Sequence, residues 1–112
     1  MLRVIDGDSF VAEARVWPGH TVTVSVRIRG IDAPEMKGRC EAERRAAMRS
    51  RAALEAIIGP GPIAMTNIGG GKYYGRVLAD VTAPDGRAAA QAMIAHNEAR
   101  AYAGGKRLAW CN

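Results

Sequence analysis

Aromatic residues are scarce in this chain of 112 residues, which has two Trp, three Tyr and one Phe. A hydrophobic core must therefore consist mainly of Val, Ile, Leu, Met and Ala. No apolar run approaches the roughly 18 residues that span a bilayer, so no membrane-spanning helix is expected, and no apolar leader precedes the patterned sequence. The formal charge of +5 is a modest excess that is compatible with phosphate-bearing partners without identifying them. With 48% hydrophobic and 24% charged residues, the composition indicates one soluble globular domain over residues 1–112.

Cysteine is equally scarce. The chain has only Cys40 and Cys111, and neither lies in a CxxC pair or beside a histidine pair that would indicate zinc. Two alternatives stay open: two unrelated thiols, or one disulfide that joins the C-terminal segment to the start of a helix. A disulfide over so long a loop would stabilise the fold by about 4–5 kcal/mol in the loop-entropy model. It would also indicate an oxidising compartment, periplasmic or secreted if a leader has been removed; otherwise the localisation is open.

Alternation with a period of two predicts strands in the first third of the chain. Residues 22–28 alternate Val or Ile with Thr, Ser or Arg. The turn residues at 18–20 predict a hairpin between this strand and an earlier one at 9–16. A further strand at 2–5 leads into the Asp-Gly-Asp turn at 6–8.

The periodicity changes to that of a helix over residues 41–58, and the Gly-Pro-Gly-Pro sequence at 59–62 ends that helix. Short strands are expected at 63–67 and 75–82, followed by an Ala-rich helix at 88–96. The face of the first helix opposite its apolar stripe carries the charged residues Glu43, Arg44, Arg45, Arg49, Arg51 and Glu55. This order of elements predicts a β-rich α+β fold: an OB-fold, five-stranded antiparallel barrel with two or three packed helices.

Two familiar motifs fail on inspection. Residues 6–9 resemble the opening of an EF-hand calcium loop, but Phe10 stands at the next ligand position and the required glycine is missing. The glycines at 69–71 and the following Lys72 resemble a phosphate-binding loop. The Ser or Thr after the lysine and the earlier glycine are both absent, so these glycines predict a flexible loop.

Three separated stretches carry the residues that can do chemistry. They read VIDGDS at 4–9, VRIRGIDAPE at 26–35 and YGRVLA at 74–79. Each alone has a plain structural interpretation: a turn, a strand end before a proline, and the start of a strand. In combination, order and spacing they resemble the thermonuclease (staphylococcal-nuclease-like) family, from residue 4 to about residue 102. The fold of that family is an OB-type five-stranded barrel with helices, in agreement with the pattern above.

The resemblance implies a calcium-dependent nuclease that hydrolyses phosphodiester bonds of DNA, RNA or both and holds one Ca²⁺. By position, the two metal-binding aspartates of the family fall on Asp8 and Asp32, and a backbone carbonyl that faces the ion falls on Ala33. The water-orienting glutamate, the two phosphate-binding arginines and an outer carboxylate fall on Glu35, Arg27, Arg76 and Asp6. Lys72 and Tyr74 are expected to contact the substrate, with core packing as the alternative for Tyr74.

The chemistry of these residue types fits the implied roles. Calcium prefers carboxylate, carbonyl and water oxygens in flexible geometry. A glutamate that accepts a hydrogen bond from water can direct that water at phosphorus. Arginine presents a planar fork of donors to phosphoryl oxygens and cannot act as an acid, because guanidinium keeps its proton in proteins.

Two departures from the family pattern are visible, since Ser9 and Ala33 stand where threonine is usual. The change at Ala33 preserves a backbone ligand but removes a hydroxyl near Glu35. The main alternative function is a non-catalytic OB-fold module that binds nucleic acid or protein. Such modules usually lack one or more of the carboxylates and arginines, and all of them are present here. No membrane contact and no obligate protein partner are implied, and a monomer is expected.

Overall fold

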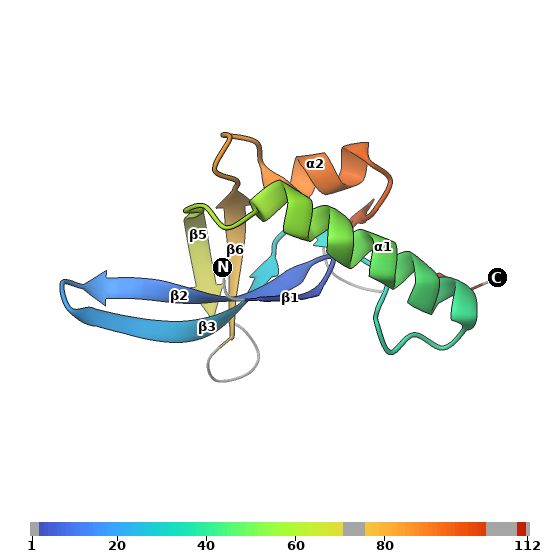
Figure 1. The fold of residues 1–112 in the computed structure, drawn as a ribbon, viewed down its shortest axis with the longest axis horizontal. Coiled ribbons are helices and arrows are strands. Elements are labelled where there is room, and N and C mark those ends of the chain that lie inside the picture. The colour runs from blue at the N-terminus through green and yellow to red at the C-terminus, as the bar shows by residue number, and fades with distance from the viewer. Residues whose placement is uncertain (1–2, 71–75, 103–109, 112) are drawn as a thin grey trace.

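The computed structural model describes residues 3–70, 76–102, 110 and 111. In that part of the chain the protein has an α+β fold with a mixed five-stranded sheet, a two-stranded sheet and two helices (Figure 1). The elements in chain order are β1 (Arg3–Asp6), β2 (Ser9–Trp17), β3 (His20–Ile28), β4 (Ile31–Asp32), α1 (Glu41–Ile58), β5 (Ala64–Gly70), β6 (Arg76–Thr82), α2 (Ala89–Ala95) and β7 (Arg100–Ala101).

The main sheet has the strand order β1-β2-β3-β6-β5. The predicted hairpin is confirmed: β2 pairs antiparallel with β3, and β1 pairs antiparallel with β2. The expectation of a wholly antiparallel sheet is wrong, because β6 runs parallel to β3. The physical reason lies in the connection, since a strand reached through a helical crossover can return in the same direction. Here α1 and β5 lie between β3 and β6 in the chain.

Only the second half of β3 contributes to the core. Val26 and Ile28 are buried, whereas Val22 is 44% exposed. Strand β6 pairs with β3 only from Ser25 to Ile28, so among the described residues the earlier half of β3 has β2 as its one strand neighbour. The β2–β3 hairpin extends beyond the rest of the molecule there (Figure 1). The clean alternation at 22–28 thus predicts the strand correctly but overstates how much of it is buried.

Helix α1 has the bounds that the sequence predicts. Cys40 is its N-cap, and Glu41 and Glu43 lie in the first turn, where negative charge interacts favourably with the helix dipole. It ends at Gly59, which adopts a positive φ of 60° and whose N–H donates to the carbonyl of Glu55. Glycine is suited to this position because it has no Cβ.

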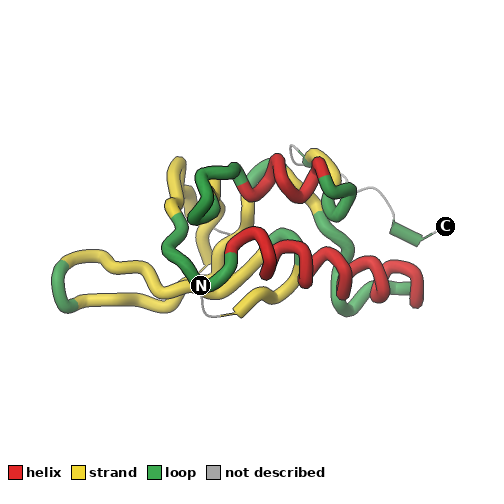
Figure 2. Tube along the Cα trace, turned by 45° about the horizontal axis from the view of Figure 1, so that its top comes forward, coloured by secondary structure: helices red, strands yellow, loops and turns green. Residues whose placement is uncertain are grey.

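The two helices pack side by side, and α2 also contacts β6 (Figure 2). Between helices and sheet lies a core that is almost entirely aliphatic, as the shortage of aromatic residues predicts. Its largest fully buried apolar side chains are Phe10, Ile28, Ile31, Leu54, Ile58, Met93 and Val26. No helix in the described residues is long and apolar enough to cross a membrane.

A disulfide joins the C-terminal segment to the start of α1. Cys40 and Cys111 are bonded, with their Cα atoms 6.1 Å apart. This separation lies within the range that the geometry of a disulfide permits. Of the two alternatives left open by the sequence, the structure has the bridged one.

The β1–β2 turn packs directly on α1 at Gly7. A Cβ atom at Gly7 would overlap the hydroxyl of Ser50 and lie 2.9 Å from the Cβ of Ala33. Ser50 is fully buried, and its hydroxyl donates to the carbonyl of Glu98 at 2.7 Å. Glycine at this position therefore allows the turn to approach both the helix and the segment after β4.

We expect Gly7→Ala to lower the free energy of unfolding by about 1–3 kcal/mol, because the new methyl group must displace a buried, hydrogen-bonded side chain. Urea denaturation monitored by circular dichroism measures this change. Gly70→Ala is the matched control, since a Cβ at Gly70 meets no atom within 4 Å. A Gly7→Ala variant as stable as the Gly70→Ala variant would contradict this account of the turn.

Candidate active site

The carboxylate of Asp8 joins three segments of the chain. Its Oδ2 lies 2.9 Å from Nη1 of Arg27 in β3 and accepts a hydrogen bond from the Ala33 N–H at 3.0 Å. Its backbone carbonyl accepts from the N–H of Ile28 at 2.8 Å. Asp8 is only 8% exposed. The turn before β2, the end of β3 and the exit of β4 thus meet at this one side chain.

Asp6 supports Asp8 from the other end of the turn. Oδ1 of Asp6 accepts a hydrogen bond from the Ser9 hydroxyl at 2.6 Å, and the N–H of Asp8 lies 3.5 Å from the same oxygen. The hydroxyl of Ser9 is therefore tied to Asp6 within the turn. The result is two carboxylates held in a half-buried turn.

Burial, followed by the effects of Asp6, raises the pKa of Asp8 to about 7 from its ordinary value of 3.8. The positive charge of Arg27 and the N–H of Ala33 act in the opposite direction but do not cancel the rise. Asp6 and Asp8 lie in one turn, and Arg27 pairs with Asp8. Carboxylate oxygens are the ligands that a hard cation such as calcium prefers.

Asp32 is placed beside Asp8 by the short β4 strand. The chain turns at Gly30, which has a φ of 91°, so that β4 begins three residues after β3 ends. Nη2 of Arg27 donates to the carbonyl of Ile31 at 3.2 Å, and this bond holds the start of β4 against the end of β3. Asp32 is 4% exposed, and its Oδ2 accepts a hydrogen bond from the indole Nε1 of Trp110 at 3.4 Å. Because Ala33 binds Asp8, its neighbour Asp32 is held close to the same carboxylate.

Arg27 has a donor available for a further acceptor. Its side chain is 21% exposed. Its buried Nη1 forms an ion pair with Asp8, but the geometry of this contact is not that of a hydrogen bond. Among the residues that the structure describes, Nη1 has no hydrogen-bond acceptor. A buried donor of this kind is unfavourable unless it is satisfied by water or a ligand.

Arg76 lies on the same face of the sheet as Arg27. The register pairs Arg76 with Ser25 and Leu78 with Arg27 across the parallel β3–β6 ladder. Paired residues share a face, and side chains two residues apart in a strand also share a face. The two arginines therefore lie on the same face of adjacent strands, and Arg76 is opposite Ser25, two residues before Arg27. Arg76 is half-buried.

Glu35 follows Ala33 by two residues and is exposed. Its backbone N–H donates to Oε2 of Glu43 at 3.1 Å, and its carbonyl accepts from the Gly38 N–H at 2.9 Å. These bonds fix the backbone of the loop that carries Glu35. The water-orienting role of its side chain stays a prediction, as does the carbonyl ligand of Ala33. Lys72 and Tyr74 lie outside the described residues.

Glu43 corrects one prediction from the sequence. It was expected on the charged face of α1, but it is buried, at 8% exposure. Its position three residues after the N-cap Cys40 is the position of the glutamate in a capping box. That spacing is the signal that could have identified it, although its carboxylate binds Glu35 instead of the cap. Nothing in the sequence indicates the contact between Trp110 and Asp32.

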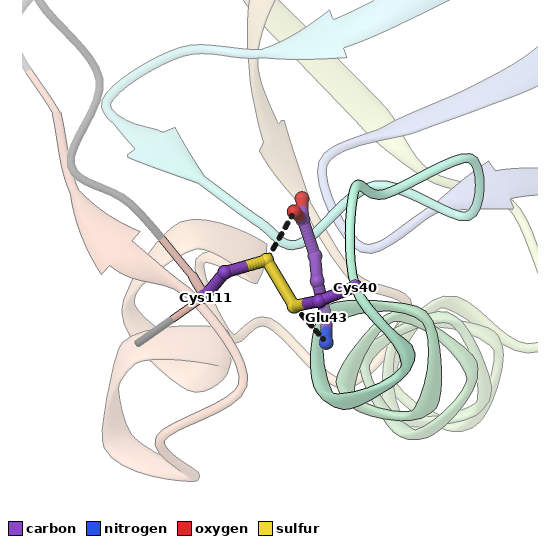
Figure 3. A group of neighbouring side chains, drawn as sticks. All are labelled: Cys40, Glu43 and Cys111. Carbon is purple, nitrogen blue, oxygen red and sulfur yellow. Dashed lines mark hydrogen bonds between the residues drawn. A yellow bond between two sulfur atoms is a disulfide. The ribbon is translucent and has the colours of Figure 1, made fainter.

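Two other features are not candidate sites. Cys40, Glu43 and Cys111 form the one group of at least three potential metal ligands in the described residues (Figure 3). Both sulfurs are used in the disulfide, so the group lacks thiolates. A cavity of about 310 Å³ near the end of α1 is lined by Ala53, Ala56, Ile57, Arg87, His96 and Glu98. It contains none of the predicted site residues.

Comparison of the chain with protein-family models and with curated proteins gives no match. The candidate site provides two buried carboxylates, an arginine paired with one of them, and a second arginine on the same sheet face.

The raised pKa of Asp8 predicts a specific pH dependence of stability in the metal-free protein. An acid whose pKa is raised by folding is more easily protonated in the folded state, so its favourable contribution is complete below about pH 4 and is lost as the pH rises through about 7. Asp8→Asn stays neutral throughout. We expect this variant to gain about 1–3 kcal/mol in the free energy of unfolding, relative to wild type, between pH 5 and pH 8.

Urea denaturation in the presence of a chelator measures this difference at the two pH values. Asp85→Asn is the control, because Arg87 holds the pKa of the exposed Asp85 below its ordinary value and this group is ionised throughout the window. If the free energies of unfolding of the wild type and of Asp8→Asn changed with pH in the same way, the pKa of Asp8 would not be raised by folding.

Proposed function

We propose that this protein is a calcium-dependent nuclease that hydrolyses phosphodiester bonds in DNA, RNA or both. One observation carries the proposal: the buried carboxylate of Asp8 contacts Arg27 and the N–H of Ala33, and the residue before Ala33, Asp32, is a second buried aspartate. Burial alone gives no reason to gather carboxylates in this way, because an ionised carboxylate is unfavourable away from water unless it is paired or binds a metal. A site that receives a cation and a phosphate accounts for the arrangement.

We include in the proposal that the sheet belongs to an OB-type barrel. The strand order supports it: β1, β2 and β3 form a meander, α1 follows the third long strand, and β5 and β6 complete the set. The metal-binding candidate Asp32 lies in the separate two-stranded β4–β7 sheet, where it pairs with Arg100. The OB architecture is one that commonly binds nucleic acid.

The residues present fit a calcium ion. Asp8 and Asp32 would supply carboxylate oxygens and Ala33 its backbone carbonyl, with water and a substrate phosphate completing six to eight oxygen ligands. When bound, calcium polarises a phosphoryl oxygen and lowers the pKa of nearby water. Asp6 acts on Asp8 through the turn, and the Trp110 indole limits the orientation of the Asp32 carboxylate.

Arg27 and Arg76 would bind the phosphoryl oxygens. Their positions on the same face of adjacent strands support the proposal that one phosphate contacts both guanidinium groups. The ion pair between the buried Nη1 of Arg27 and Asp8 holds the guanidinium in place before substrate arrives, and the Arg27 side chain is 21% exposed. Donors that are positioned in advance stabilise the charge that develops in the transition state. The leaving oxygen receives its proton from water, since neither guanidinium releases one.

Glu35 would accept a hydrogen bond from the attacking water. Its exposure keeps it accessible to solvent, and the bond from its N–H to Glu43 limits how far its backbone moves. Proton transfer to a positioned carboxylate typically contributes 10²–10⁴-fold to a rate. Lys72 and Tyr74 remain proposed contacts to the rest of the nucleic acid strand.

A non-catalytic module that binds nucleic acid or protein is the second candidate. It would use the same basic sheet face without cleavage. The buried pair Asp8 and Asp32 favours the enzyme, because a surface that only binds a polyanion gains nothing from carboxylates beside its arginines.

Calcium binding gives the first test of this proposal. We expect Ca²⁺ to raise the midpoint of thermal unfolding of the wild-type protein, because a ligand that binds only the folded state stabilises it. Asp32→Asn should weaken calcium binding, measured by titration calorimetry, by at least about tenfold. Asp85→Asn, at an exposed aspartate that pairs with Arg87, is the control. Equal affinities in the two variants would remove Asp32 from the site.

The arginines give the second test. Arg76→Lys and Arg27→Lys keep the charge but remove the fork, and we expect each to lower the cleavage rate of single-stranded DNA or RNA by at least about 100-fold. Binding of the same oligonucleotides, measured by fluorescence anisotropy, should weaken much less. Arg87→Lys, at an exposed arginine paired with Asp85, is the control.

The outcomes separate the two candidates. A wild-type protein that binds oligonucleotides but never cleaves them with calcium present would support the binding module. An Arg76→Lys variant that cleaves at the wild-type rate would leave the enzyme standing and exclude this arginine from its site.

A further inference from the structure

The loop that carries Glu35 is built around the buried side chain of Glu43. Besides the bond from the Glu35 N–H to Oε2, the loop approaches Glu43 at Gly38 so closely that a Cβ there would lie 2.6 Å from Cγ and Cδ of Glu43. The next residue of α1, Arg44, donates from Nη1 to the Gly38 carbonyl at 2.9 Å. The first turn of α1 thus holds both ends of the 35–38 turn.

On its other side Glu43 contacts the disulfide (Figure 3). Its Oε1 lies 3.7 Å from Sγ of Cys111, and its N–H donates to Sγ of Cys40 at 3.4 Å. The contact of Oε1 is one of packing, because a disulfide sulfur carries no proton to donate. Glu43 therefore lies between the Glu35 loop and the bridge that brings back the C-terminal segment.

The residue before Cys111 reaches the second carboxylate of the candidate site. The indole Nε1 of Trp110 donates to Oδ2 of Asp32, and the guanidinium carbon of Arg100 lies 3.7 Å from the centre of the Trp110 ring. Arg100 is itself the strand partner of Asp32 in the β4–β7 ladder. The disulfide, the cation–π contact and the ladder together hold the indole on Asp32.

A purely structural role would not require this chemistry at Glu43. In a capping box the glutamate returns to the N–H of its own N-cap. Here the carboxylate extends away from the helix to the N–H of Glu35, two residues beyond the Ala33 that binds Asp8. Burying an ionisable group in this position is unfavourable unless its hydrogen bonds are made, so the group ties the loop to the helix with little freedom.

We propose that Glu43, the Cys40–Cys111 disulfide and Trp110 form a tail clamp that positions Glu35 and Asp32. The roles of Glu35 and Asp32 rest on the proposed function, whereas the clamp is a set of contacts within the metal-free chain. Glu43 and Trp110 are positioning residues, since they act on the site through Glu35 and Asp32. The clamp holds the backbone of Glu35 from the first turn of α1 and the carboxylate of Asp32 from the C-terminal segment, and the disulfide joins the two.

The Glu43 arm of the clamp is tested by hydrogen exchange at the backbone amide of Glu35. We expect Glu43→Ala to speed exchange of this amide by at least about tenfold, because its acceptor is removed. Glu43→Gln retains an oxygen acceptor and should restore most of the protection. Glu55→Ala, at an exposed glutamate of the same helix, is the matched control and should leave this amide unchanged. Equal exchange in Glu43→Ala and Glu55→Ala overturns the proposal, whether or not the protein cleaves nucleic acid.

Cleavage kinetics give the functional readout of the same variants. Glu43→Ala should lower kcat by about 10- to 100-fold with KM little changed, because a misplaced Glu35 affects the chemical step and leaves phosphate binding intact. Glu43→Gln should recover most of that loss. A fall in kcat that the glutamine does not rescue contradicts positioning through the hydrogen bond.

The Trp110 arm is tested by calcium affinity. Trp110→Phe keeps the disulfide and an aromatic ring under Arg100 but removes the donor to Asp32, and we expect it to weaken calcium binding about tenfold. The Cys40→Ser/Cys111→Ser double variant should weaken calcium binding and also speed exchange of the Glu35 amide. Unchanged or tighter calcium binding in Trp110→Phe overturns this arm. If wild-type protein binds no calcium and cleaves nothing, the proposed function fails. The rate of hydrogen exchange at the Glu35 amide still tests whether Glu43 holds this loop.

Discussion

The buried carboxylate of Asp8 is the interaction on which the rest of the site depends. It joins the β1–β2 turn to β3 through Arg27 and to the exit of β4 through the N–H of Ala33. The turn can approach this closely only because Gly7 has no side chain to meet Ser50. Burial and Asp6 raise the pKa of Asp8 to about 7, although Arg27 and the N–H of Ala33 act in the opposite direction. A bound cation would favour the ionised form of this carboxyl group.

This dependence gives Arg27 two roles that differ from the role of Arg76. Arg27 holds the fold through Asp8 and the Ile31 carbonyl, so removing it leaves a buried carboxylate without its ion pair. Arg76 lies on the same sheet face in β6, which pairs with β3 and β5. A substitution of Arg76 is thus the more direct test of the proposed phosphate binding, whereas a substitution of Arg27 combines that effect with a loss of stability.

The candidate site is assembled from both ends of the chain. Asp8 comes from the first turn, and the indole of Trp110 returns to Asp32 after the chain has completed both sheets and both helices. The disulfide at Cys40 makes this return specific, because it fixes the C-terminal segment at the start of α1, beside Glu43. The sequence predicts that Glu43 lies on the charged, solvated face of α1. The structure instead buries its carboxylate, which holds the loop after Ala33.

The sequence by itself determined the local structure: the hairpin at β2–β3, the bounds of α1 between Cys40 and Gly59, and the aliphatic core, because periodicity, capping residues and turn residues act over a few neighbours. It also named the residues of the candidate site, though from a resemblance and not from contacts. The tertiary structure decided the parallel pairing of β3 with β6, the exposure of Val22, the burial of Glu43 and the contact of Trp110 with Asp32. Each of these joins residues that are distant in the chain or depends on which surface another element covers. Local patterns carry no information about such neighbours, so packing settled them.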